Sequence, residues 1–172
     1  HDSSDCGAAA LATVALAHGL SIGLERLRDL SATDRGGTNL LALKHAARRI
    51  GFSADCARGG YDELLAAPVP LIAHVTTAEG LHHFVVVHRT SARRVEVADP
   101  ARGLETLTRR DFEERWTGYV LLLAPDPDAA QPTIATDSVA RRFLRLLGPH
   151  SSLLAEALLV SLVLAVLGLS TS

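Results

Sequence analysis

The chain has 172 residues, of which 48% are hydrophobic, and a formal net charge of −2. This is enough for one ordinary domain with a buried core and a short additional segment. Lysines and arginines form no stripe through the body of the chain, which argues against a nucleic-acid partner, because phosphates require clustered cations.

The N-terminal third of the chain predicts three helices. Residues 5–16 are rich in Ala and Leu without a breaker after Gly7, which indicates a buried helix. A short helix is expected at residues 24–30 and an amphipathic one at residues 39–50, ended by Gly51. Candidate N-cap residues are Ser3, Ser4 and Asp5 for the first helix and Thr38 for the third.

The middle of the chain changes to a strand pattern. Short runs rich in Val and Leu, bounded by Gly, Pro and Ser, predict strands at residues 69–75, 84–88, 94–98 and 119–123. One short helix is expected between them at residues 109–115. Helices followed by an antiparallel sheet indicate an α+β domain, which we place at residues 1–125.

The C-terminal segment differs in composition. Residues 126–140 are expected to form a linker, and residues 141–172 a basic segment that leads into the start of a truncated first transmembrane helix. The apolar run 153–169 would cover roughly 25 Å as a helix, just short of a bilayer core of about 30 Å. The alternative is a C-terminal core helix. Arginines before the run, at positions 141, 142 and 145, would place its N-terminal side in the cytosol.

The two cysteines, Cys6 and Cys56, are too few for a disulfide framework and favour a reducing compartment. Cys6 falls at the expected start of the first helix, where unpaired N–H groups and the helix dipole stabilise a thiolate. A thiolate of this kind can serve as a nucleophile. The alternative is a buried structural thiol, which is the commoner role of a lone cysteine. Cys56 follows Phe52 and Ala54 at period two and is expected to be a core thiol.

A thiolate nucleophile requires an imidazole beside it and a third group that orients the ring. The run from Gly80 to Val87 places His82 and His83 at the entry of a strand, and the next strand ends in Asp99. If the two strands pair as a hairpin, a histidine and Asp99 lie at the same end of the sheet. On spacing alone this is one of several possible His/Asp pairs.

Three blocks of the sequence are informative together: Asp5-Cys6-Gly7-Ala8-Ala9, Gly80-Leu81-His82-His83-Phe84-Val85-Val86-Val87 and Val97-Ala98-Asp99-Pro100-Ala101-Arg102-Gly103. In this order they resemble the bacteriocin-processing cysteine peptidases that form the N-terminal domain of peptidase-containing ABC transporters. The resemblance extends from His1 to about Pro125, and Trp116–Leu123 is similar to the closing strand of that family.

The resemblance implies a papain-like fold, with Cys6 as nucleophile, His83 as general base and acid, and Asp99 as the group that orients the imidazole. His82 does not match the motif, and strand alternation would turn it to the opposite face. The other histidines, at positions 18, 45, 74 and 88, have no partner pattern and are expected to be surface or satisfied residues. Histidine and cysteine do not recur at ligand-like spacing, so no metal site is expected.

By the same resemblance, the domain removes the leader from a ribosomal precursor peptide after a double-glycine-type site, with the leader helix in a hydrophobic groove. It requires no cofactor of its own, and ATP would bind only in the transporter part. The parent transporter is expected to be a homodimer, with this domain on the cytosolic face of the bacterial plasma membrane.

Two other functions remain possible for this sequence. One is a non-catalytic domain that tethers export cargo, and the other is a different cysteine-dependent acyl transferase. The family also places an oxyanion-stabilising glutamine six positions before its cysteine, which would be the position immediately before His1.

Overall fold

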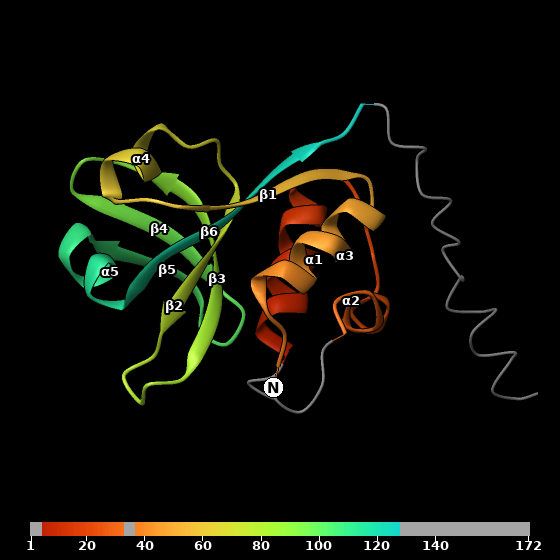
Figure 1. The fold of residues 1–172 in the computed structure, drawn as a ribbon. Helices are drawn as coiled ribbons and strands as arrows, with labels where there is room; N and C mark the ends of the chain where they lie inside the picture. Colours follow the sequence, from red (N-terminus) through yellow and green to blue (C-terminus); the bar gives the residue numbers. More distant parts are fainter. Residues whose placement is uncertain (1–4, 33–36, 128–172) are drawn as a thin grey trace, which may run out of the picture. The chain divides into compact units, whose positions relative to one another are not determined.

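The computed structural model describes residues 5–32 and 37–127. Apart from residues 126 and 127, the expected linker lies outside the described residues, as does the expected membrane segment. Three helices come first: α1 (Cys6–Ala17), α2 (Leu24–Leu30) and α3 (Leu40–Arg49). They pack together on one side of the sheet (Figure 1), with α1 against strand β3 and α3 against strand β1. None of the described helices has both the length and the apolar composition needed to cross a membrane.

The sheet has six strands, all antiparallel to their neighbours, in the order β1-β6-β2-β3-β4-β5. Their bounds are β1 (Phe52–Arg58), β2 (Leu71–Thr76), β3 (His82–Thr90), β4 (Arg94–Asp99), β5 (Gly103–Thr108) and β6 (Trp116–Pro125). Helices α4 (Tyr61–Ala66) and α5 (Arg109–Arg115) complete the described elements. The predicted α+β class with N-terminal helices on an antiparallel sheet is confirmed.

The strands alternate between two apolar cores because successive side chains point to opposite faces of a sheet. In β3, Phe84 and Val86 join the helices, whereas Val85 and Val87 join the core that includes Tyr61 of α4 and Phe112 of α5. The central strand β3 is therefore buried on both faces, and its position is tightly fixed.

The predicted end of α3 is confirmed, and its predicted cap is not. Helix α3 ends before Gly51, whose φ of +94° favours glycine. The N-cap residue of α3 is Asn39, whose side chain accepts a hydrogen bond from the N–H of Ala42 at 2.8 Å. The predicted cap Thr38 is wrong, because its hydroxyl donates instead to the carbonyl of Ser31 at 2.8 Å.

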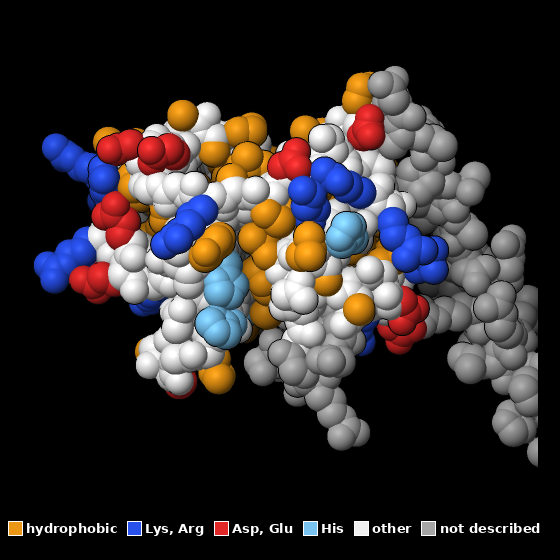
Figure 2. Space-filling view, viewed as in Figure 1, with side chains coloured by type: hydrophobic (Ala, Val, Ile, Leu, Met, Phe, Trp, Pro, Cys, Tyr) orange, Lys and Arg blue, Asp and Glu red, His pale blue; other side chains and the backbone are white. Residues whose placement is uncertain are grey.

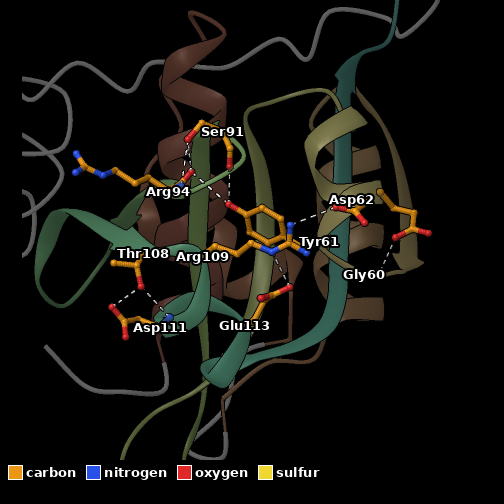
Figure 3. Close-up of polar contacts among 10 residues, drawn as sticks. Gly60, Tyr61, Asp62, Ser91, Arg94, Thr108, Arg109, Asp111 and Glu113 are labelled. Atoms are coloured by element: carbon orange, nitrogen blue, oxygen red, sulfur yellow. Dashed lines mark hydrogen bonds and ion pairs between the residues drawn. The ribbon is translucent and has the colours of Figure 1, made fainter.

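Helices α4 and α5 are joined by a group of polar contacts shown in Figure 3. The guanidinium of Arg109 lies over the ring of Tyr61, 4.3 Å from its centroid, and contacts Asp62 and Glu113. The Tyr61 hydroxyl donates to the carbonyl of Ser91 at 2.8 Å. These contacts attach both short helices to the loop between β3 and β4.

Candidate active site

Cys6 is the first residue of α1, and only 8% of its surface is exposed. The first N–H groups of a helix have no intrahelical acceptor, so the sulfur lies at the positive end of the helix dipole. The alanines that follow it let α1 pack closely on the sheet. The predicted place of Cys6 at the start of a buried helix is confirmed.

Gly7 allows the loop before α3 to approach the start of α1. A Cβ atom at this position would overlap with the Cγ2 methyl of Thr38 and lie 3.2 Å from a methyl of Leu43. Because Thr38 is held by its hydrogen bond to Ser31, it cannot easily turn away. The glycine after the cysteine therefore serves close packing in this fold.

The histidines that begin β3 point to opposite sides, as strand alternation predicts. His83 is 8% exposed and lines a cavity with Cys6. His82 is exposed, and its ring stacks on that of His74, with centroids 5.0 Å apart. The half-buried His74 in turn has its Nδ1 at 2.8 Å from the Thr117 hydroxyl.

Asp99, the last residue of β4, lies beside His83 as the hairpin geometry requires. Strands β3 and β4 pair in antiparallel register, with Val86 opposite Ala98. Nε2 of His83 is 2.8 Å from Oδ1 of Asp99, and both side chains are about nine-tenths buried. The backbone N–H of Ala101 also donates to this carboxylate oxygen at 2.7 Å, which fixes its orientation.

Cys6 lines the same cavity as the His83 side chain and has the largest influence on its pKa. Since Nε2 is engaged with Asp99, Nδ1 is the ring nitrogen left for the sulfur. Hydrogen bonding with Cys6, followed by the hydrogen bond and charge of Asp99, raises the pKa of His83 to about 9, although burial acts in the opposite direction. The three groups thus form a connected series that favours an imidazolium at neutral pH.

This series opens into a cavity of about 290 Å³. Its walls beyond the three polar groups are largely apolar and come from β2, β3, β4, β5 and α5, including Val75, Val85, Val97, Leu107 and Phe112. Arg102, Glu105 and Arg115 also line it. The cavity can hold an extended peptide segment beside the sulfur, with apolar side chains against its walls.

Two features of the site differ from the sequence analysis. Cys56 is exposed and does not belong to the core. The period-two pattern fails because burial on the face of Phe52 and Ala54 ends before Cys56. The sequence also gave no sign of Arg28, whose guanidinium pairs with the carboxylate of Asp5 immediately before the cysteine. Asp5 is the N-cap residue of α1, yet its side chain makes no capping bond.

A helix that presents a buried cysteine to a histidine of an antiparallel sheet is the arrangement of papain-like cysteine peptidases. Residues 1–128 match the peptidase C39 family. The chain therefore belongs to this family and is a cysteine peptidase domain of that kind.

Curated relatives support the assignment. The chain is 35% identical over 145 residues to the lactococcin-G-processing and transport ATP-binding protein LagD of Lactococcus lactis. The aligned region covers 83% of this chain and 20% of LagD. It is 33% identical over 172 residues to the transport/processing ATP-binding protein ComA of Streptococcus pneumoniae, which covers 98% of this chain and 24% of ComA. The chain spans only a fifth to a quarter of the length of these two relatives.

Solved structures show the same fold. The peptidase domain of Streptococcus ComA, a bifunctional ABC transporter, superimposes with a TM-score of 0.69 at 30% identity, covering 73% of this chain and 95% of that domain. A double-glycine-motif protease from an AMS/PCAT transporter, crystallised with its leader peptide, gives a TM-score of 0.65 at 30% identity. That match covers 70% of this chain and 84% of the protease.

Proposed function

We propose that this domain is a cysteine endopeptidase in which Cys6, His83 and Asp99 act together on a precursor peptide. The observation that carries the proposal is that Cys6, His83 and Asp99 line one cavity large enough for a peptide, with the His83 ring hydrogen-bonded to Asp99. Each group has the chemistry that its role requires: a thiol at a helix start, an imidazole that favours the protonated form, and a fixed carboxylate.

The reaction proceeds in two steps. The Cys6 thiolate attacks the scissile carbonyl, and Nδ1 of His83 gives its proton to the departing amine, which leaves a thioester on the sulfur. His83, now neutral, then takes a proton from a water molecule that attacks the thioester, and the thiolate is released. Asp99 accepts from Nε2–H throughout, so that the other ring nitrogen stays directed at the sulfur. One water is consumed for each bond cut.

The proposed substrate is the leader of a ribosomal peptide of the bacteriocin type, cut after a double-glycine-type site. LagD and ComA are processing and transport proteins, and the AMS/PCAT protease was crystallised with a leader peptide. The apolar walls of the cavity, together with the apolar side chains gathered between the helices and the sheet in Figure 2, suit the apolar face of a leader helix.

The same comparisons support a proposal for the parent protein. We infer that this domain belongs to an ATP-driven peptide exporter, on the cytosolic side of the bacterial plasma membrane, with ATP bound in a separate domain and two copies in the assembly. The domain itself would use neither a cofactor nor a metal. The Lys, Arg and acidic side chains of the described residues are interspersed on the face shown in Figure 2, which suits a peptide partner better than a nucleic acid.

Incubation of the chain with a synthetic double-glycine leader peptide tests the activity. We expect cleavage after the second glycine, abolished in Cys6→Ala while peptide binding is retained, and unchanged in the matched control Cys56→Ala. Cleavage that survives Cys6→Ala would exclude Cys6 as the nucleophile. Binding without cleavage by the unaltered chain would contradict the proposal and support a tethering domain.

A further inference from the structure

Asp5, the residue before the proposed nucleophile, is bound by Arg28 of helix α2, which lies 23 residues further along the chain. Nε of Arg28 donates to Oδ1 of Asp5 at 2.8 Å, and Nη2 of the same guanidinium donates to Oδ2. Two parallel bonds between a guanidinium and a carboxylate fix both the position and the plane of each group. Asp5 therefore has a defined orientation although it caps no N–H of α1.

Helix α2 is anchored so that Arg28 reaches this point. Leu27, the preceding residue, is fully buried. The hydroxyl of Ser31, which is also buried, donates to the carbonyl of Leu27 at 2.7 Å and secures the last turn of the helix. Helix α2 packs against both α1 and α3. A helix of only seven residues is thus held rigidly enough to direct one guanidinium at the start of α1.

The charge of Asp5 would oppose a thiolate at Cys6 unless it were compensated. Asp5 adjoins Cys6 in sequence and lines the same cavity, and its side chain is only 14% exposed. Water therefore screens its charge poorly, and an unpaired carboxylate there would favour the neutral thiol. The other charged or titratable groups that line this cavity with Cys6 are His83, Asp99, Arg102, Glu105 and Arg115.

We propose that Arg28 is a positioning residue for the nucleophile, which neutralises and orients the Asp5 carboxylate so that Cys6 can face His83 as a thiolate. This inference rests on the proposed function, since it takes Cys6 as the nucleophile. Arg28 would influence the sulfur through its paired bonds to Asp5. Asp5, in turn, would hold the first turn of α1 in the orientation that directs Cys6 towards His83.

The test measures thiolate formation separately from cleavage. In a Cys56→Ser background, the rate of alkylation of Cys6 by iodoacetamide is followed against pH for the unaltered site and for three variants. Removing the cation in Arg28→Gln should raise the midpoint of this profile by roughly 1 pH unit. Removing the anion in Asp5→Asn should lower it. The double variant Asp5→Asn/Arg28→Gln should return it close to its original value.

Opposite shifts from the two single variants, with restoration in the double variant, would not arise from loss of structure. Arg28→Lys keeps the charge but loses the paired bonds, so its midpoint should stay near the original value while kcat for leader cleavage falls severalfold. The matched control is Arg26→Gln, which removes an exposed arginine from the same helix and should leave both the midpoint and kcat unchanged.

A midpoint that moves in none of the three variants would overturn the proposal, even if cleavage is lost. If Arg28→Gln does not fold, the downward shift in Asp5→Asn decides the question, and its absence counts against the proposal. Failure of the proposed function would look different. In that case the unaltered chain would not cleave a double-glycine leader peptide, whatever the alkylation profiles show.

Discussion

His83 and Asp99 are joined by a hydrogen bond of 2.8 Å, and the carboxylate oxygen that forms it is itself fixed by the backbone N–H of Ala101 at 2.7 Å. The turn that follows β4 therefore sets the position of the carboxylate, and the carboxylate sets the plane of the imidazole. The backbone thus determines, through Asp99, how the His83 ring is oriented towards Cys6. Charge and orientation are separable contributions of Asp99, and mutation can distinguish them.

Replacement of Asp99 should impair cleavage in two graded steps. Asp99→Asn keeps an oxygen that can accept from the ring N–H but removes the negative charge, whereas Asp99→Ala removes both. Positioned proton transfer contributes roughly 10²–10⁴ to rates, so we expect kcat/KM to fall by about 10² in Asp99→Ala. The loss in Asp99→Asn should be smaller. Steady-state kinetics on a double-glycine leader peptide measure both values, and equal losses would show that orientation contributes nothing.

The pH dependence of cleavage should reflect the raised pKa of His83, about 9 against an ordinary value of 6.5. The protonated ring is needed beside the thiolate and as the donor to the leaving amine. Because the pKa is raised, this form persists through neutral pH and is lost as the pH rises through about 9. The profile of kcat/KM should therefore decline on its alkaline side near pH 9. A decline centred near pH 6.5 would contradict the proposed imidazolium.

The same profile in Asp99→Asn provides a control. The hydrogen bond to Cys6 is the largest cause of the raised pKa, and the hydrogen bond and charge of Asp99 add to it. Removal of that charge should move the alkaline decline to lower pH without restoring it to 6.5. If the alkaline decline of kcat/KM does not move, it reflects the titration of a group other than His83.

Elements with strong local signals were predictable from sequence. The valines of β3 are buried on both faces of the sheet and those of β4 on one face, so the composition of these runs indicates strands. The alanine-rich run of α1 is likewise buried along most of its length. Since His83 and Asp99 fall at adjoining ends of two consecutive strands, one assumption of hairpin pairing was enough to bring them together.

The elements that the sequence did not reveal lack such signals. Strand β1 contains Ser53, Asp55 and Arg58, and strand β5 lies at the sheet edge with most of its side chains at least partly exposed. Pairing with neighbouring strands, rather than their own composition, makes them strands. Helix α4 has six residues, too few for a periodic pattern. The contact between Arg28 and Asp5 depends on the packing of α2 against α1, which no local pattern reports.

Gly7→Ala should destabilise the fold, mainly through an overlap with the methyl group of Thr38. Alanine in a helix is favoured over glycine by about 1 kcal/mol, but here its Cβ would overlap with Cγ2 of Thr38. Overpacking of this kind costs about 1–3 kcal/mol, so we expect the free energy of unfolding to fall. Urea denaturation measures the change.

Thr38→Ser isolates the cause, since serine keeps the hydroxyl that donates to Ser31 and lacks the methyl group. In the Thr38→Ser background, Gly7→Ala should cost less than in the unaltered chain, because the overlap with the Thr38 methyl is gone and only the closer approach to Leu43 remains against the gain in helix propensity. If Gly7→Ala costs the same in both backgrounds, the contact with Thr38 is not the reason that glycine is required.

Two neighbouring arginines of α5 offer a matched comparison of half-buried and exposed contacts. Arg109 and Arg110 each pair with a glutamate four residues later, but only Arg109 also lies over Tyr61 and reaches Asp62 (Figure 3). The Arg110 side chain is 87% exposed, against 39% for Arg109. Exposed ion pairs contribute little because water screens them and ordering costs entropy.

Arg109→Ala should therefore lower the free energy of unfolding by about 1–2 kcal/mol, through the lost cation–π contact and the packing of the arginine stem. Arg110→Ala should change it by no more than about 0.5 kcal/mol. Both values come from urea denaturation followed by circular dichroism. Because neither residue contacts the proposed catalytic groups, cleavage per folded molecule should be unchanged in both variants. Equal costs for the two substitutions would mean that the contact with Tyr61 adds no stability, and that α4 and α5 are held by the apolar core around Phe112 alone.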